Sequence, residues 1–223
     1  SDSELVIQHS QREYLPLPKT MSLRNTLPAF GSAVIFFLLT VTHTESSSDA
    51  SSSLSYIRSG CRVTLYPEVC YRTISRYSSQ IQRSPSRLAK VAMAISLSHT
   101  RNVSLYLSSR RQSGYRPSER YAASALSDCC SNLRDAVDQI DGSIKQMRML
   151  RTTGYGDEFR FQVSNVQTWM SSALTDQETC TDGFQDVRGG SMKADVVGRV
   201  DAIKRLTSNA LALFNSYASK GRN

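Results

Sequence analysis

Three aspartates, Asp135, Asp138 and Asp141, recur at intervals of three residues in a segment with a helical pattern. Side chains at this spacing lie along one flank of an α-helix. Paired carboxylates can serve as general acid and general base in hydrolysis, so this flank is a first candidate for chemistry. A solvated helix face produces the same pattern, and the residues by themselves favour that interpretation.

A hydrolase would need further groups, and the sequence offers few. Downstream of Thr44 there is a single histidine, His99, in the middle of a predicted helix. No GxSxG nucleophile turn, P-loop or glycine-rich dinucleotide turn is present. A Cys-x-x-Cys pair, which many zinc sites use, is also missing. We therefore predict that the protein is not an enzyme and that it binds no cofactor and no metal.

A second candidate is a row of small and polar side chains further along the chain. Ser172, Thr175 and Asp176 lie beside a predicted buried seam, where small residues let a partner approach closely. Tight packing between helices would explain Ser172 equally well, so Thr175 and Asp176 are the preferred contact residues. We expect Trp169, the only tryptophan, to anchor the core.

Four long helices are predicted to position these residues. Ser84 and Pro85 form a typical helix start, and that helix runs to about Arg111. In three later segments the apolar residues advance by alternating fours and threes, which is the pattern of bundle helices. These segments run from Ala122 to about Leu150, from Phe159 to Cys180 and from Val196 to Tyr217.

Short connections at Gly114 to Pro117, Thr152 to Gly156 and Gly189 to Gly190 make successive helices antiparallel neighbours. The predicted fold is all-α: an up-down-up-down four-helix bundle over residues 84–220, preceded by a helical hairpin over residues 53–79. The hairpin helices are expected at Leu54 to Ser59 and Tyr66 to Ser78. Together, residues 53–220 would form one disulfide-bonded domain.

The N-terminal part has the pattern of a secretory leader over residues 21–44. Arg24 precedes 13 mostly apolar residues, Ala29 to Val41, which are too few to span a bilayer comfortably. Residues 1–20 are expected to be an upstream extension without a fold, and residues 45–52 a serine-rich linker. The protein is thus predicted to be secreted, without stable membrane association. Asn102 begins the only N-glycosylation sequon, Asn-Val-Ser.

The chain has five cysteines, Cys61, Cys70, Cys129, Cys130 and Cys180. Leaving one unpaired allows fifteen arrangements, so the count does not settle the connectivity. Cys61 and Cys70 flank a turn and could close the helical hairpin. Cys129 and Cys130 lie about 100° apart around their helix, so they cannot point the same way.

The charge balance is basic, with 27 Lys and Arg against 19 Asp and Glu, a formal net charge of +8. Such a field favours polyanions, including the galacturonate of pectin. The arginines are scattered and form no run of five, which argues against nucleic acid. The basic surface is therefore predicted to be solvated, with weak, salt-sensitive association with pectin as an alternative.

Residues 166–184, VQTWMSSALTDQETCTDGF, resemble the third bundle helix of the plant invertase/pectin methylesterase inhibitor family. Asp128-Cys129 and the DAVD sequence at Asp135 to Asp138 match that family's second bundle helix. The similarity covers roughly Ser53 to Ser219 and is closest to the pectin methylesterase inhibitor branch. It implies the disulfides Cys61–Cys70 and Cys129–Cys180, which leave Cys130 as a free thiol.

The resemblance also implies a function, which is inhibition of pectin methylesterase through a stoichiometric, non-covalent 1:1 complex in the cell wall. The family contacts the esterase with its second, third and fourth bundle helices, so the expected contact residues are Ser172, Thr175, Asp176, Asp138 and Asp141. Because many of these contacts would be carboxylates and hydroxyls, we expect a tighter complex at mildly acidic pH.

Three alternatives remain open. Acid invertase is a second target of the family, but its inhibitors carry a Pro-Lys-Phe motif that is missing between Gly183 and Lys193. The inhibitory pro-region of an esterase precursor is less favoured, because no catalytic domain or dibasic site follows the similar region. A wall protein that binds pectin without inhibiting an enzyme would account for the basic charge.

Overall fold

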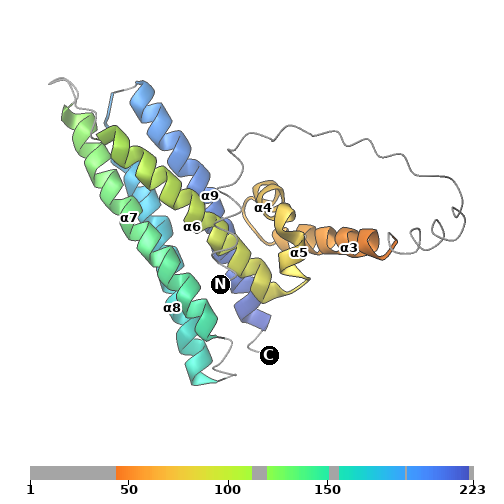
Figure 1. Cartoon of the computed structure of the whole chain (residues 1–223). Helices are drawn as coiled ribbons and strands as arrows, with labels where there is room; N and C mark the ends of the chain where they lie inside the picture. Colours follow the sequence, from red (N-terminus) through yellow and green to blue (C-terminus); the bar gives the residue numbers. More distant parts are fainter. Residues whose placement is uncertain (1–43, 112–119, 151–155, 189, 221–223) are drawn as a thin grey trace, which may run out of the picture.

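A computed structural model describes residues 44–111, 120–150, 156–188 and 190–220 of the chain. Within these ranges every regular element is a helix. The four longest run side by side as a bundle (Figure 1): α6 Pro85–Arg111, α7 Arg120–Met149, α8 Asp157–Asp182 and α9 Ser191–Lys220. Around the bundle, α6 packs on α7, α7 on α8, α8 on α9 and α9 on α6. The predicted all-α four-helix bundle is confirmed.

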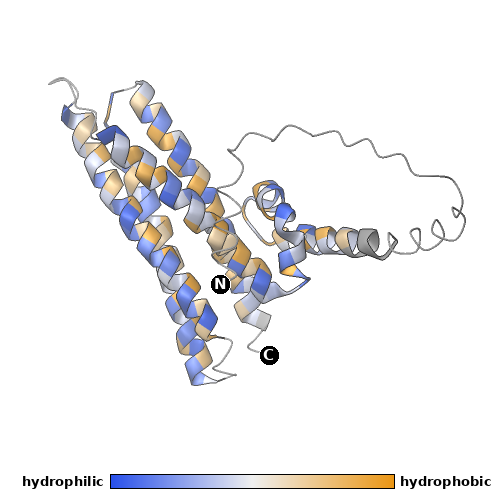
Figure 2. Cartoon of the chain, viewed as in Figure 1, coloured by the Kyte–Doolittle hydropathy of each residue, from blue (hydrophilic) through white to orange (hydrophobic). Residues whose placement is uncertain are grey.

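The bundle forms because each long helix has an apolar side that must be removed from water. Apolar and polar residues alternate in stripes along all four helices (Figure 2). The heptad positions of α8 illustrate the agreement with the predicted pattern, since Val163, Val166, Met170, Ala173 and Cys180 are all buried.

The buried apolar residues form two clusters, one at each end of the bundle. The hairpin-end core includes Ile57, Leu97 and Phe214, and the disulfide-end core includes Leu107 and Phe184. In each cluster the largest side chains are almost completely buried. The hairpin therefore belongs to the same packing unit as the bundle helices.

A layer of buried polar side chains lies near the boundary between the two cores. The hydroxyls of Ser96 and Thr207 are 2.8 Å apart, which joins α6 to α9. Gln177 Nε2 donates to Thr100 Oγ1 at 3.3 Å, which joins α8 to α6. Buried polar groups need such partners because an unpaired group costs free energy. This layer ties three of the four helices together by directional bonds.

The chain before the bundle folds into a helical hairpin, as predicted, that projects from one side of it (Figure 1). It consists of α3 Thr44–Cys61, α4 Pro67–Ile74, the 3₁₀ turn η2 Ser75–Tyr77 and α5 Ser78–Ile81. Gln82 and Arg83, which have φ angles of 47° and 55°, turn the chain toward α6. The backbone N–H of Arg87 donates to Ser84 Oγ at 3.4 Å, so Ser84 caps α6 as predicted.

The hairpin differs from the prediction in two respects. Helix α3 begins at Thr44 and not near Leu54, so it includes the segment 45–52 that was expected to be a linker. Buried Ile57 packs the C-terminal part of α3 on the bundle, and the serine-rich turns continue the helix from there. The second helix, predicted to be continuous over residues 66–78, is instead divided into α4, η2 and α5.

Several predicted features lie outside the described residues. They are the upstream extension 1–20, the leader up to residue 43, Gly114, Pro117 and most of the connection at Thr152 to Gly156. Among the helices that the structure describes, none combines the length and apolar character needed to cross a membrane.

The cysteines pair as the family resemblance implies. Cys61–Cys70 joins the end of α3 to α4, and Cys129–Cys180 joins α7 to α8 across 51 residues of chain. Cys130 is a buried free thiol. Burial raises the pKa of the Cys130 thiol, with a smaller opposing effect from a hydrogen bond with Ser108. A thiol in this environment is largely protonated and therefore weakly reactive.

Candidate functional site

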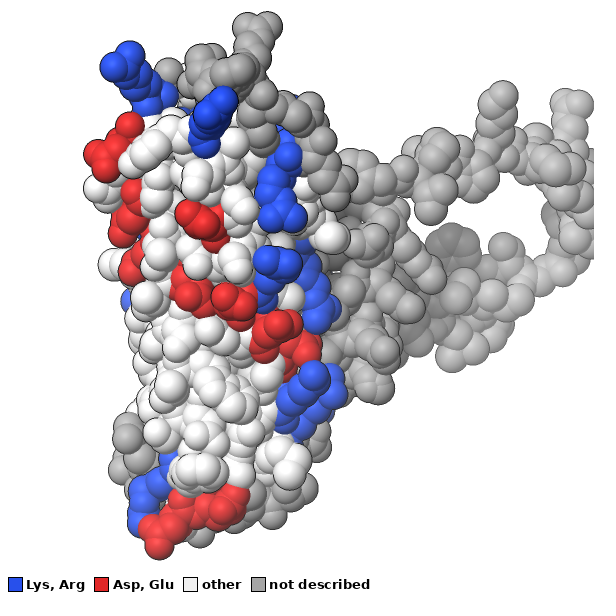
Figure 3. All heavy atoms as spheres, turned by 90° about the vertical axis from the view of Figure 1, so that its left-hand side faces the viewer, with Lys and Arg blue, Asp and Glu red and all other residues white. Residues whose placement is uncertain are grey.

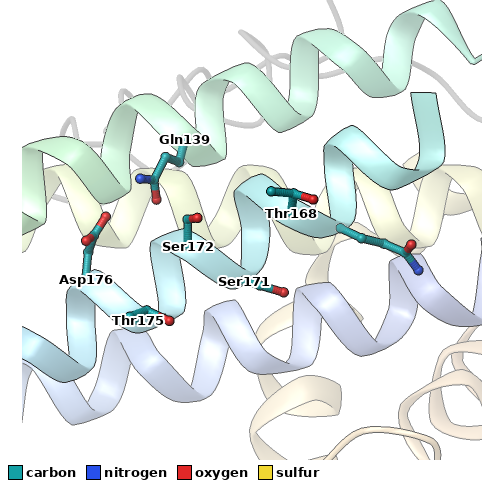
Figure 4. Close-up of a pocket in the computed structure, with 7 residues that line it drawn as sticks. Gln139, Thr168, Ser171, Ser172, Thr175 and Asp176 are labelled. Carbon is teal, nitrogen blue, oxygen red and sulfur yellow. The ribbon is translucent and has the colours of Figure 1, made fainter. Parts of the chain in front are cut away.

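The outer face of α8 carries an open hollow of about 520 Å³ that extends to α7. The residues that line it all have polar side chains: Gln139, Gln167, Thr168, Ser171, Ser172, Thr175 and Asp176. We call this feature the α7–α8 groove. Figure 4 shows Gln139, Ser172 and Asp176 together between the two helices, while Ser171 and Thr175 lie on the side toward α9.

The spacing of the α8 residues explains how the groove arises. Thr168, Ser171, Ser172, Thr175 and Asp176 follow one another at intervals of one to three residues and return to one face of the helix every turn. The opposite face carries the buried heptad residues. Because serine and threonine are short, the space above α8 stays empty. Long side chains at the same positions would fill it.

Two acceptor atoms inside the groove are buried and lack a hydrogen-bond partner among the described residues. They are Gln139 Oε1, from α7, and Asp176 Oδ2, from α8. Burial raises the pKa of the Asp176 carboxyl, and the nearby charge of Asp135 raises it further. A hydrogen bond from Gln139 partly offsets both effects. The groove thus contains polar groups that a bound partner could satisfy, since unpaired buried acceptors carry a free-energy cost.

The three predicted contact residues of α8 come together in this groove, but the two aspartates of α7 do not line it. Asp138 is exposed on the surface of α7. Asp141 is held between two cations, with Arg101 Nη2 at 3.2 Å and Lys145 Nζ at 2.8 Å. Its carboxylate therefore links α6 to α7 and is already neutralised within the molecule.

Trp169 differs from its predicted role as a core anchor. It remains 36% exposed and lies against α7 at Gly142, where an added Cβ would come within 3.2 Å of the indole Cε3 atom. A larger residue at this position would require the indole to shift slightly. The indole thus forms part of the surface beside the predicted contact residues of α8.

The remaining sequence candidates are distributed elsewhere. His99 lies on the surface of α6, where partial burial of its ring and the charge of Arg76 lower the pKa of its imidazole. Asn102 is also exposed on α6, where a glycosylating enzyme could reach it. Gln177 is buried in the core, and Thr179 Oγ1 donates to the carbonyl of Thr175 at 2.9 Å. None of these residues completes a catalytic arrangement with the groove.

Sequence reasoning did not identify four of the lining residues, Gln139, Gln167, Thr168 and Ser171. Helical spacing from Ser172 and Thr175 could have pointed to Thr168 and Ser171. Gln139 is brought in by the packing of α7 on α8, and Gln167 faces α9, where its Nε2 donates to Asn215 Oδ1 at 2.9 Å.

The chemistry available in the groove is recognition through hydrogen bonds. Its lining contains hydroxyls, two amides and one carboxylate, but no histidine, cysteine or cationic group. Within the described part of the chain, no group of three or more His, Cys, Asp and Glu residues is arranged to hold a metal ion. Such a surface suits a protein partner that supplies complementary donors and acceptors.

Comparison with known proteins gives a consistent assignment. The family model described as "Plant invertase/pectin methylesterase inhibitor" matches residues 55–213. Pectinesterase inhibitor 11 of Arabidopsis thaliana is 34% identical, over 86% of this chain and 97% of the relative. The "21 kDa protein" of Daucus carota is 36% identical, over 77% of this chain and 88% of the relative.

A solved structure also shares the fold. The crystal structure of a mutant form of a pectin methylesterase inhibitor from Arabidopsis superposes with a TM-score of 0.56. The superposition covers 70% of this chain and 92% of that chain, with 19% sequence identity.

Proposed function

The chain belongs to the plant invertase/pectin methylesterase inhibitor family, and we propose that it inhibits pectin methylesterase by binding it through the α7–α8 groove. The family model and the Arabidopsis relatives carry inhibitor names, so the protein is a non-catalytic inhibitor. In the proposed complex it covers the cleft in which the esterase binds pectin, and it excludes the substrate without making or breaking a covalent bond.

One observation carries this proposal above all. Ser172, Thr175 and Asp176 line a single polar groove that also contains unpaired buried acceptors. A partner side chain that donates to Asp176 Oδ2 or Gln139 Oε1 would satisfy an atom that the free inhibitor leaves without a bond. Such pairing favours the complex because the cost of the unpaired acceptor is already present in the free protein.

The position of the two helices supports a rigid contact surface. The Cys129–Cys180 bridge joins α7 to α8, and Trp169 packs on Gly142 near the other end of the same pair. A surface fixed in this way loses little conformational entropy on binding. The groove can therefore act as a preformed docking site, and in the proposed 1:1 complex it holds one enzyme molecule.

The proposal includes secretion to the cell wall, where pectin and its esterases are found. It rests on the leader pattern of residues 21–44 and on the extracellular chemistry of disulfides. Acid invertase stays the alternative target. No described feature favours it, and Phe184 to Lys193 lacks the Pro-Lys-Phe motif.

The test is a titration of the purified protein against a plant pectin methylesterase and an acid invertase at pH 5.5. We expect esterase activity to fall to a minimum at about one inhibitor per enzyme, with invertase unaffected. Loss of invertase activity alone would overturn the target. If neither activity changes, the wall-binding alternative gains support.

A matched pair of variants locates the contact. Thr175→Trp places a bulky ring in the groove, and Ser59→Trp places the same ring on the exposed surface of α3. We expect Thr175→Trp to weaken inhibition at least tenfold, about 1.4 kcal/mol, and Ser59→Trp to have little effect. Equal inhibition by both variants would exclude the groove as the contact.

A further inference from the structure

The charges of this protein are divided between two sides of the bundle. Residues 44–111 and 190–220, which form the hairpin, α6 and α9, contain 15 Lys and Arg against 5 Asp and Glu. Residues 120–150 and 156–188, which form α7 and α8, contain 6 against 10. The first group therefore has a formal charge of +10 and the second of −4, although the whole chain has only +8.

The view onto the α7 and α8 side shows this division (Figure 3). Acidic side chains extend across that face in a band, and basic side chains follow one of its edges. The hairpin lies on the other side of the bundle (Figure 1). The basic excess thus lies mainly away from the α7–α8 groove, and an enzyme bound at the groove would leave it accessible.

Part of the basic side is built around the disulfide of the hairpin. The guanidinium of Arg58 stacks over the Tyr71 ring at 3.9 Å, and that of Arg205 lies 5.6 Å from the centre of the Tyr66 ring. Tyr66 is fixed to α9 because Asn209 accepts from its backbone N–H and donates to its carbonyl, at 3.1 and 2.9 Å. Stacking holds an arginine in place while its N–H edge stays free for an anion.

Two more arginines lie next in sequence to the hairpin disulfide and to Tyr71. Arg62, which follows Cys61, and Arg72, which follows Tyr71, are both exposed. Among the described residues no ion pair joins Arg58, Arg62, Arg72 or Arg205 to a carboxylate. Glu68 is the only acidic residue of α4. We call these four arginines the hairpin arginine group, and its positive charge is mostly not compensated.

We propose that the hairpin arginine group binds polygalacturonate, the carboxylate-bearing form of pectin from which the methyl esters have been removed. Arginine suits this ligand because its planar guanidinium pairs with carboxylates in a bidentate manner. Fully esterified pectin has no charge and would not be held. The inference rests on the proposed function for the choice of this polyanion, and the surface is separate from the groove.

The consequence is that the inhibitor would accumulate where esterase has already acted. Ester hydrolysis creates the carboxylates that attract the basic side, and the acidic side stays available for the enzyme. A linear polyanion also releases condensed counterions when arginines neutralise it, so binding should weaken steeply with salt, as it does for DNA.

The experiment measures binding of the full protein to polygalacturonate and to fully methyl-esterified pectin over a series of salt concentrations. The variant Arg62→Gln/Arg72→Gln/Arg205→Gln, which we call the hairpin variant, removes three of the four charges of the hairpin arginine group. Its matched control, Arg134→Gln/Arg148→Gln/Arg188→Gln, removes three exposed charges from the opposite side, two from α7 and one from the segment after α8. A third variant, Arg62→Lys/Arg72→Lys/Arg205→Lys, keeps the charge, and circular dichroism checks that all three are folded.

We expect the wild type to bind polygalacturonate and not the esterified polymer. The hairpin variant should lose at least tenfold in affinity and show a shallower salt dependence, and the matched control should change by about twofold or less. The lysine variant keeps the charge but not the bidentate geometry, so its loss should lie between these two. Equal loss in both glutamine variants, equal binding to esterified pectin, or equal binding to anionic lipid vesicles would overturn the proposal.

Inhibition assays with a soluble substrate separate this proposal from the proposed function. The hairpin variant should inhibit pectin methylesterase as well as the wild type does. If the wild type binds polygalacturonate but inhibits no esterase, the proposed function fails and this inference stands. If the wild type inhibits esterase but does not bind polygalacturonate, this inference fails and the proposed function stands.

Discussion

Two sides of the molecule differ in their surface chemistry although both are built from helices. One side is the α7–α8 pair, and the other is formed by the hairpin, α6 and α9. The first is acidic, is joined by a long-range disulfide and leaves a polar groove open at its surface. The second is basic, is joined by a short-range disulfide and places arginines on tyrosine rings. One bundle can therefore present two chemically distinct surfaces without a second domain.

The difference follows from what each side does with its polar residues. On the α7–α8 side, Gln139 and Asp176 retain acceptors without a partner, which suits a surface that meets a protein. On the other side, Tyr106 donates to Asp195 at 2.8 Å, and Arg199 both pairs with Asp195 at 2.7 Å and stacks on Tyr106 at 3.9 Å. That cluster is internally satisfied and joins α6 to α9.

The largest expected effect that distinguishes the two sides comes from their disulfides. In the chain-entropy model, Cys129–Cys180, with a sequence separation of 51, should contribute about 4 kcal/mol, and Cys61–Cys70, with a separation of 9, about 2.6 kcal/mol. We predict that the variant Cys129→Ser/Cys180→Ser loses more unfolding free energy than Cys61→Ser/Cys70→Ser. Urea denaturation of both measures the difference, and an equal or reversed order would contradict it.

Two glycines provide an intermediate effect. An added Cβ at Gly198, on α9, meets nothing within 4 Å, but at Gly142, on α7, it would lie 3.2 Å from the Trp169 ring. Gly198→Ala should therefore raise the unfolding free energy by up to about 1 kcal/mol, through helix propensity alone. Gly142→Ala should gain less or lose stability, because the indole must move.

Thermal unfolding and the fluorescence of Trp169 measure these two changes together. The emission should shift in Gly142→Ala and stay the same in Gly198→Ala. If both variants gain equal stability with unchanged fluorescence, the result would contradict the close contact between Trp169 and Gly142.

The smallest expected effect concerns pH. Burial and Asp135 raise the folded-state pKa of Asp176, so its charged form is less favoured in the native protein than in the unfolded chain. The native state is therefore most stable, with respect to this group, below the ordinary carboxyl pKa, and loses stability as pH rises through the raised value. Asp176→Asn should stabilise the free protein near neutral pH by less than about 1 kcal/mol, with Asp138→Asn, on exposed α7 surface, as the control.

The Asp176 carboxyl should also make the proposed complex tighter at mildly acidic pH, which is the direction expected from the sequence. Enclosing Asp176 against an enzyme costs less when the carboxyl is neutral, so affinity should rise as pH falls from 7.5 to 5. The dissociation constant of Asp176→Asn should depend less on pH than that of the wild type. A wild-type constant that is flat, or that improves toward neutral pH, would refute this prediction.

Much of the architecture could be read from the chain. The heptad spacing of Leu126, Leu133 and Ile140 predicted the buried side of α7, and Ser84 with Pro85 predicted where α6 begins. These features are local, because a helix returns its side chains to one face every three or four residues. The extent of α3 was missed because serine-rich sequence gives no periodic signal, while the packing of Ile57 supports the helix beyond it.

The sequence by itself determined the helical bundle and its buried heptads, and it pointed to three of the α8 residues that line the groove, Ser172, Thr175 and Asp176. Only the tertiary structure decided which of them share a groove. Gln139 joins Ser172 and Asp176 because α7 packs on α8, whereas Asp141, on another face of α7, pairs with Arg101 of α6. Helical periodicity fixes the face on which a side chain lies, whereas its neighbours across the interface depend on the packing of residues far apart in the chain.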